Sequence, residues 1–415
     1  MDITNSLILK KMKKQYLLII AAVLLTFISS CKEETASYKT LIITGQNNHN
    51  WQASSPVLKQ ILENTGMFTA EILQTPEEGG DMNIFDPDFS KYKLVVLDYN
   101  GDPWSDKANE GFLNFVRNGG GVVVYHAANN SFPGWKEYNE ITGLGGWGDR
   151  SEKDGPYMYY QKNELIIDTT AGPGGSHGQR REFVVRKRVT DHPITLGLPD
   201  RWLHGNDELY SQLRGPGKNM TILATAFADS SLGGGTMRDE PILMVINYEK
   251  GRIFHTAMGH AEENGGPAMQ CAGFITTLQR GAEWAVTGNV TQPVPYDFPS
   301  VAGVVLRPDF REASLEDVLG RIGSYDIAKS TKNMTYLQNH IRRLAGDEEG
   351  LLDLEKKIVK VLNSSEATVD SKKLLLRELS WFGSDYSTEA VKELVSDNDL
   401  KDEAAFALAR LQSGK

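Results

Sequence analysis

The chain has 415 residues, two cysteines and a formal net charge of −10. This length is enough for one large domain and a smaller one, and two cysteines exclude a small fold held together by many disulfides. No basic stripe occurs along the sequence, which excludes nucleic acid as the expected partner.

The amino terminus has the parts of a secretory signal. A basic cluster over residues 10–14 precedes an uncharged apolar run over residues 16–28. This run is shorter than the roughly 20 apolar residues that span a bilayer. The small-residue pair before Cys31 resembles the lipobox of bacterial lipoproteins, which implies that Cys31 is lipidated and becomes the first mature residue. We therefore expect a signal peptide over 1–30, with an uncleaved membrane anchor as the alternative.

The lipobox resemblance implies a protein of the bacterial cell envelope. It would be lipid-anchored to the outer membrane, on the periplasmic face or at the cell surface. After cleavage, 40 basic and 53 acidic residues give a formal net charge of −13. Cys271 is then the only free thiol, so no internal disulfide can form and the core must supply the stability. The polar residues 31–38 are expected to form a short tether.

Strand-like and helix-like segments alternate over the next part of the chain. Short apolar runs rich in β-branched residues predict strands, and apolar residues at helical spacing predict helices. The predicted strands are 40–44, 68–73, 94–97, 122–125, 182–186, 221–225, 242–247 and 252–256, and the predicted helices are 54–65, 108–116 and 268–286. The alternation is typical of an α/β fold with a mostly parallel sheet and helices on both faces.

Two stretches depart from this alternation. Residues 129–180 are rich in glycine and aromatic residues and predict a long irregular excursion, a kind of segment that usually has a function. Residues 289–332 are expected to be a linker. Residues 333–415 contain amphipathic helical patterns with short turns, and Asp385–Leu411 resembles a HEAT-like helix pair. We expect a small all-α carboxyl-terminal module that binds a protein partner or caps the domain.

Polar residues follow several predicted strands at the point where each strand ends. In α/β sheets, ligands bind outside the carboxyl ends of the strands. The segments that leave the strands are 45–51, 98–102, 126–130 and 255–260, and three of these four contain histidine. Because the protein has only eight histidines, this clustering indicates a binding or catalytic site at one sheet edge.

Amide and aromatic side chains near these strand ends suit a sugar ligand. Amides both donate and accept hydrogen bonds, and aromatic rings pack against the apolar face of a sugar ring. The expected substrate-binding residues are His49, Trp51, Asn100, Asn129, Asn130, Trp135, His177, Arg181 and His260. For the aromatic residues the alternative is that they only pack the excursion.

Several segments resemble the ThuA family, which is named for trehalose utilisation. They are Gly45–Trp51, Gly119–Asn129, Asp191–Ile194, Asp207–Tyr210 and Gly251–His260, in family order. The resemblance covers about residues 39–288. It implies a flavodoxin-like sheet, as in class I glutamine amidotransferases, and a role in carbohydrate metabolism linked to 3-keto derivatives of disaccharides.

The amidotransferase resemblance also suggests site residues. By position, His126 replaces the nucleophilic cysteine of those enzymes and His255 keeps their histidine, so the two imidazoles are expected to face each other. Amidotransferase chemistry is excluded, because Cys271 lies in a predicted helix. We expect His126, His255 and Glu208 to transfer protons during hydrolysis or elimination at 3-keto glycosides.

Two questions stay open at the level of sequence. The first is whether a metal such as zinc is bound, because His126, His255 and His260 would suit one but no close metal-binding spacing occurs. A metal-free acid–base pair explains the same residues, so no cofactor is certain. The second is whether the protein is an enzyme at all, since a non-catalytic sugar-binding lipoprotein would need the same aromatic and amide side chains.

Overall fold

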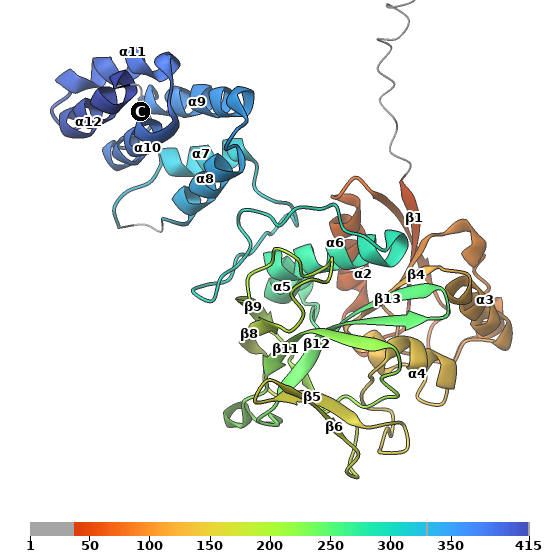
Figure 1. Ribbon diagram of the computed structural model, residues 1–415. Coiled ribbons are helices and arrows are strands. Elements are labelled where there is room, and N and C mark those ends of the chain that lie inside the picture. Colours follow the sequence, from red (N-terminus) through yellow and green to blue (C-terminus); the bar gives the residue numbers. More distant parts are fainter. Residues whose placement is uncertain (1–36, 329–330, 414–415) are drawn as a thin grey trace, which may run out of the picture.

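The computed structural model describes residues 37–328 and 331–413 (Figure 1). The expected signal peptide, Cys31 and most of the expected tether lie outside these residues. Within the described part of the chain, no helix is both long enough and apolar enough to cross a membrane.

The larger domain is built on one sheet with the strand order β2-β1-β3-β4-β13-β12-β11-β8-β9. Five adjacent strands are parallel: β1 (Tyr38–Thr44), β2 (Phe68–Gln74), β3 (Leu94–Leu97), β4 (Gly121–Tyr125) and β13 (Gly251–Thr256). Antiparallel pairing continues the sheet through β12 (Asp239–Tyr248), β11 (Met220–Phe227), β8 (Arg181–Lys187) and β9 (Arg201–Asp207). The chain direction reverses at each antiparallel pair. Two such pairs lie between β13 and β11 and two more between β11 and β9, so β9 runs parallel to β13. The carboxyl end of β9 therefore opens on the same edge as those of the parallel strands.

Helices cover both faces of this sheet, as the sequence predicts. On β1, Ile42 packs in the core formed with α2 (Trp51–Glu63) and α6 (Ala272–Thr287). Its neighbours Leu41 and Ile43 pack in the opposite core, formed with α3 (Asp106–Arg117) and α4 (Lys136–Thr142). Successive side chains of a strand point to opposite faces, so one fully apolar strand supplies both cores. The predicted α/β fold with a mostly parallel central sheet is confirmed.

Some element bounds differ from those predicted. Helix α2 begins at Trp51 rather than Ser54, because the Asn50 side chain caps it by accepting a hydrogen bond from the backbone N–H of Ala53. The single helix predicted over 268–286 is two helices, α5 (Gly266–Gln270) and α6, separated by Cys271 in an extended conformation.

The stretch predicted to be irregular contains regular structure. Besides α4, it holds the hairpin β5 (Tyr157–Gln161) and β6 (Glu164–Asp168), and β7 (Ser176–His177), which pairs with β10 (Tyr210–Ser211). The hairpin turn is Lys162-Asn163, and both residues have positive φ angles of 51° and 67°. A two-residue turn of this kind usually contains glycine, so its sequence gives little sign of a hairpin.

The carboxyl-terminal module is entirely helical and has its own core (Figure 1). Its helices are α7 (Leu315–Gly323), α8 (Lys332–Arg343), α9 (Glu348–Leu362), α10 (Val369–Phe382), α11 (Asp385–Glu393) and α12 (Lys401–Gln412). Helix α7 lies within the stretch predicted as a linker and begins at a capping box formed by Ser314 and Asp317. The helical module is thus confirmed and begins earlier than expected, while its likeness to HEAT repeats stays a prediction.

Part of the expected linker belongs to the larger domain. The Phe310 side chain is 3% exposed and lies in the core beneath α2 and α6. The backbone N–H of Arg307 donates to the Gln270 carbonyl, and that of Leu203 donates to the Ser300 carbonyl. The segment around residues 300–310 therefore packs as a strap on the larger domain.

Candidate functional site

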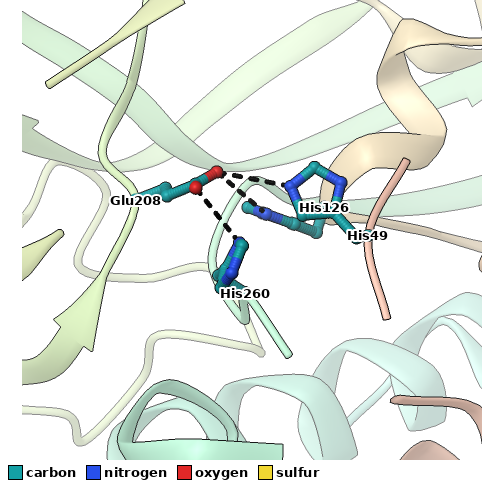
Figure 2. Close-up of side chains that lie close together, drawn as sticks. All are labelled: His49, His126, Glu208 and His260. Atoms are coloured by element: carbon teal, nitrogen blue, oxygen red, sulfur yellow. Dashed lines mark hydrogen bonds and ion pairs between the residues drawn. The ribbon is translucent and has the colours of Figure 1, made fainter. Parts of the chain in front are cut away.

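Four polar side chains from distant parts of the chain meet at the carboxyl edge of the sheet (Figure 2). We call the group the His–Glu cluster, and its members are His49, His126, Glu208 and His260. In this order, they follow the ends of strands β1, β4, β9 and β13. Parallel strands bring their carboxyl ends to one edge, which is why residues so far apart in sequence converge here.

The Glu208 carboxylate is the centre of the cluster (Figure 2). Its Oε2 atom lies 3.3 Å from His49 Nε2 and 3.7 Å from His126 Nε2, and its Oε1 atom lies 3.2 Å from His260 Nδ1. A fourth imidazole stands further out, with His177 Nε2 at 4.0 Å from Oε2. Burial alone would raise the pKa of the Glu208 carboxyl, but the surrounding imidazoles hold it well below its usual range.

His126 is the most constrained member of the cluster. It follows β4 directly, in a short 3-10 helix over His126–Asn130, and its φ angle is +44°. Non-glycine residues adopt such angles rarely, and the strain is found mostly at functional sites. Its ring is 1% exposed, stacks on Tyr210 at 4.4 Å between centroids, and lies 2.8 Å from the Ala257 carbonyl through Nδ1.

The buried Asp207 carboxylate holds the segments that carry Glu208 and His260. Its Oδ1 atom accepts hydrogen bonds from the backbone N–H groups of Glu208 and His260, at 2.8 and 2.9 Å. Its Oδ2 atom accepts from the backbone N–H of Gly259 and lies 2.7 Å from His204 Nε2. Burial alone would raise the pKa of Asp207, but His204 keeps it below its usual value, so the carboxylate stays ionised.

His49 and His260 form the solvent side of the cluster. The side chains of His49 and His260 are 11% and 18% exposed, against 1% for His126. Burial lowers the pKa of His49, although Glu208 partly opposes this. The neutral imidazole of His49 is therefore favoured near neutral pH.

Three members of the cluster, His49, Glu208 and His260, line a cavity of about 500 Å³. Amides and aromatic rings form its walls, namely Asn48, Asn100, Asn130, Phe132, Trp147 and Tyr210, and His177 stands beside them. The cavity therefore offers both the hydrogen-bonding groups and the flat apolar faces that a sugar requires. Of the residues expected to bind substrate, it contains His49, Asn100, Asn130, His177 and His260.

Four other expected binding residues are placed elsewhere. Among the described residues, Trp51, Trp135, Asn129 and Arg181 are not part of the cavity lining. Trp135 packs against Tyr138, Phe132 and Trp104 in the core, so the packing interpretation holds for it. Asn129 is fully buried, and Trp51 and Arg181 begin α2 and β8.

His255 does not join the cluster, in contrast to the expectation that it faces His126. The ring is fully buried, and its Nδ1 atom donates to the Thr142 carbonyl at 2.9 Å. Its Nε2 atom accepts from the Asn129 side chain at 3.1 Å. Both nitrogens are thus used within the protein, and the partner of His126 across the site is Glu208 with His49 and His260. Burial lowers the pKa of His255 to about 4.

The sequence did not single out Asp207 or Tyr210 as site residues. Asp207 positions two cluster residues, and the Tyr210 hydroxyl lies 3.4 Å from His49 Nε2. Both belong to the segment Asp207–Tyr210, so the signal was present in that motif. The strand β9 that delivers the motif was not predicted, and without it the motif had no place at the sheet edge.

The larger domain matches a known protein family. The chain matches the family model described as ThuA, trehalose utilisation, over residues 39–285. The crystal structure of a ThuA-like protein from Parabacteroides merdae is similar, with 52% identity and a TM-score of 0.65, over 67% of this chain and 100% of that one. A ThuA-like protein from Bacteroides uniformis matches with 18% identity and a TM-score of 0.40, over 61% of this chain and 93% of that one. No curated protein matches the chain. The family model spans more than half of the sequence, and the chain therefore belongs to the ThuA family.

Proposed function

We propose that this protein is a carbohydrate-processing enzyme that cleaves 3-keto glycosides by acid–base chemistry. The observation that carries the proposal is the convergence of several imidazoles on one carboxylate that lines a polar cavity. ThuA resemblance links such a site to oxidised disaccharides. The amides and aromatic rings of the cavity wall suit a sugar, and the His–Glu cluster supplies imidazole and carboxylate groups of the kind that acid–base chemistry uses.

The reaction begins with removal of the proton on C2 of the sugar, which the neighbouring 3-keto group makes acidic. The electron pair of the C2–H bond forms an enolate with C3. Its collapse forms the C1–C2 double bond and breaks the bond from C1 to the leaving oxygen, which departs as an alcohol after taking up a proton. Addition of water across C1–C2 then gives net hydrolysis, and without it the outcome is a lyase reaction.

His177 is the side chain best placed to accept the C2 proton. Its Nδ1 atom lies 2.9 Å from the Gly178 carbonyl, and because a carbonyl only accepts, Nδ1 carries the hydrogen and Nε2 keeps a lone pair. The side chain is 39% exposed and lines the cavity, so it can reach a substrate. The imidazolium that forms can return the proton to the leaving oxygen.

The imidazoles of His49 and His260 face the cavity and can donate hydrogen bonds to the ketone oxygen as negative charge develops on it. His126 is buried, with its Nε2 atom 3.7 Å from Glu208 Oε2. His126 and Glu208 are still proposed as essential to the reaction. His255 is proposed as a positioning residue, because its two nitrogens are occupied by Thr142 and Asn129.

The test is product analysis with matched native and 3-keto disaccharides. We expect the wild-type protein to release monosaccharide only from the 3-keto substrates. The variants His177→Gln and His126→Ala should lose at least about 100-fold in turnover, the usual effect of removing a general base or an essential site group. The control His192→Gln, far from the cavity, should keep full activity. Undiminished turnover by the His177 and His126 variants would exclude this mechanism.

A non-catalytic sugar-binding protein is the second candidate. It is favoured by the cavity wall itself, where Asn48, Asn100 and Asn130 stand near Trp147 without need of proton chemistry. The same substrate panel separates the two functions. Binding of native and 3-keto disaccharides with equal affinity, and no product from either, would support the binding protein and contradict the enzyme.

We further propose that the protein works in the cell envelope. The basic cluster, the short apolar run and Cys31 support export and lipid attachment. Labelling cells with a fatty-acid analogue should mark the wild-type protein but leave Cys31→Ser unlabelled, and fractionation should move that variant out of the membrane. Protease treatment of intact cells separates surface exposure from the periplasmic face. Equal labelling of both proteins would contradict the proposal.

A further inference from the structure

The His–Glu cluster has nearly the spacing of ligands around one metal ion. One ligand-capable atom from each of its four residues lies within 4.8 Å of all the others. The three distances from Glu208 oxygens to imidazole nitrogens are 3.2, 3.3 and 3.7 Å. Bonds of about 2.0–2.1 Å to a tetrahedral zinc ion place neighbouring ligand atoms about 3.3 Å apart. The carboxylate-to-imidazole distances therefore already come near this value, and ligand atoms nearer the 4.8 Å limit would close in when an ion binds.

The hydrogen bond of His126 fixes which of its nitrogens carries a proton. Nδ1 lies 2.8 Å from the Ala257 carbonyl, and a carbonyl oxygen can only accept. Nδ1 is therefore the donor, and in a neutral ring Nε2 holds a lone pair. That lone pair faces Glu208 Oε2 at 3.7 Å, so two electron-rich atoms point at each other in a buried place. A cation bound between the two atoms would turn their mutual repulsion into attraction to the ion.

A proton on His126 Nε2 would relieve this contact less well than a metal ion. The ring is 1% exposed, and Nε2 has no hydrogen-bond partner among the described residues. At 3.7 Å from Glu208 Oε2, an N–H at this position would be too far away for a hydrogen bond, so a protonated ring would have only a loose ion pair with the carboxylate. By contrast, an imidazole with Nδ1–H on a carbonyl and Nε2 on a metal is the usual arrangement of metal-binding histidine.

We propose that the His–Glu cluster binds one divalent transition-metal ion of the zinc class. His126 and His49 would bind through Nε2, His260 through Nδ1, and Glu208 through its carboxylate. His260 Nδ1 is also buried and has no hydrogen-bond partner within the described part of the chain, although Glu208 Oε1 lies 3.2 Å away. Asp207 fixes the backbone N–H groups of both Glu208 and His260, so two of the ligands are positioned before an ion arrives.

The ligand set selects among metals. Three imidazole nitrogens and one carboxylate suit zinc, iron or nickel, whereas magnesium and calcium prefer oxygen ligands. The exposed side of the cluster faces the cavity, where His49 and His260 are the outermost ligands. Zinc sites can expand from four to five ligands, so an ion held here could accept an oxygen of the substrate from the cavity.

A metal ion would also deepen the proposed reaction, and this step rests on the proposed function. A 3-keto sugar carries a ketone flanked by hydroxyl groups, so two adjacent oxygens can reach one metal ion. A bound cation would supply Lewis-acid chemistry there, polarising the ketone and favouring loss of the C2 proton. His177 stays outside the proposed ligand set and is left free as the proton acceptor.

Metal binding can be tested without any sugar. The protein is stripped with a chelator, and zinc chloride is titrated against a competing chromophoric chelator, with metal analysis giving the stoichiometry. We expect one zinc ion per chain, and at least about 100-fold weaker binding by His126→Ala and Glu208→Gln. His340→Ala makes the same change in α8, far from the cluster, and should bind like the wild type. If the His126 variant does not fold, His260→Ala provides the same test at a partly exposed ligand, and it should also bind zinc more weakly.

The outcomes separate the metal from the sugar chemistry. No bound zinc, or equal affinity in wild type, His260→Ala and Glu208→Gln, overturns the metal site. Magnesium binding as tightly as zinc also contradicts it, because the nitrogen ligands disfavour magnesium. Zinc binding with no turnover of any 3-keto glycoside keeps the metal site and overturns the proposed function. Full turnover after complete metal removal keeps the function and overturns the role of the ion in it.

Discussion

At the scale of single residues, the Asp207 carboxylate does as much for the site as any cluster member. It accepts four hydrogen bonds, and three come from the backbone N–H groups of Glu208, Gly259 and His260. The fourth links it to His204. Both oxygens of the buried carboxylate thus accept hydrogen bonds that hold the loop of Glu208 against the loop of Gly259 and His260.

We predict that Asp207→Asn both destabilises the protein and disorders the cluster. An amide NH₂ would face donors that it cannot accept from, and His204 would lose its buried counter-charge. Breaking a buried pair of this kind costs about 3 kcal/mol. Denaturant unfolding should report the lower free energy of unfolding, and zinc titration should report weaker binding. Wild-type values in both measurements would contradict this role for Asp207.

His255 gives a pH-dependent contribution to stability. Burial lowers its pKa from 6.5 to about 4 in the folded protein. Between these pH values, His255 binds a proton in the unfolded chain but not in the folded protein. Its contribution to the free energy of unfolding is therefore fully present above pH 6.5 and is lost as the pH falls towards 4. The expected loss is about 3 kcal/mol.

The check is the free energy of unfolding as a function of pH for wild type and His255→Gln. The difference between the two proteins should change across this window, because glutamine does not titrate. A constant difference would mean that His255 takes up its proton equally in both states. The test is independent of the metal site, since both nitrogens of His255 bond within the protein.

The ends of the predicted strands indicate where the site lies but not where each side chain points. His49, His126 and His260 lie at one edge of the sheet, as predicted. The prediction for His255 was wrong, because its position on a strand fixes the edge while its side chain still points to one face or the other. His255 pairs in register with Val124, whose side chain lies in the core beneath α3 and α4, and so it reaches Thr142 at the end of α4 instead of the cavity.

At the scale of elements, β9 decides whether the site is complete, because it carries Asp207 and leads to Glu208. This strand packs closely on α5 through Gly205. A Cβ atom at Gly205 would lie 2.4 Å from the Pro267 carbonyl oxygen, which is much too close. Backbone cannot move as a flexible side chain does, so any larger residue must push β9 away from α5.

We predict that Gly205→Ala displaces the end of β9 and with it Glu208. Overpacking of this kind costs about 1–3 kcal/mol, and the cluster should bind zinc more weakly and lose turnover. Gly320→Ala is the matched control, because nothing lies within 4 Å of a Cβ atom there in α7. Unfolding curves should show that variant at or slightly above wild-type stability. Equal behaviour of the two variants would contradict the tight packing of β9.

The elements that the sequence predicted were those with strong local signals. Buried parallel strands such as β1 and β3 are continuous apolar runs and were found nearly to their ends. Strand β9 has the sequence Arg-Trp-Leu-His-Gly-Asn-Asp, with polar residues at buried positions. Burial of His204 and Asp207 is possible because the two side chains hydrogen-bond to each other. Its tertiary contacts, and not its composition, make it a strand.

At the scale of the whole molecule, the domain boundary lies between the strap around residues 300–310 and helix α7. The strap fills the core with Phe310 and pairs Leu306 with Cys271. The helical module that follows has its own core and exposes large aromatic side chains at Trp381, Tyr386 and Phe406. We propose, as the sequence suggested, that this module recruits a protein partner.

Two truncations test this division. A chain that ends at residue 314 keeps the strap, so we expect wild-type stability of the larger domain and wild-type zinc binding. A chain that ends at residue 294 loses Phe310, and burial of such a side chain is worth about 3 kcal/mol or more. It should unfold at clearly lower denaturant. If removal of the helices after residue 314 abolished zinc binding or turnover, the module would be part of the site and not a recruiting domain.

The wide separation of the cluster residues along the chain has a consequence for folding kinetics. His49 and Glu208 are 159 positions apart, so their contact closes a very long loop and is expected to form late. An intermediate with only the parallel strands would hold three imidazoles without the carboxylate that completes the set. Recovery of zinc binding during refolding should therefore lag behind recovery of the far-ultraviolet circular dichroism signal, which would make metal binding the last step of folding.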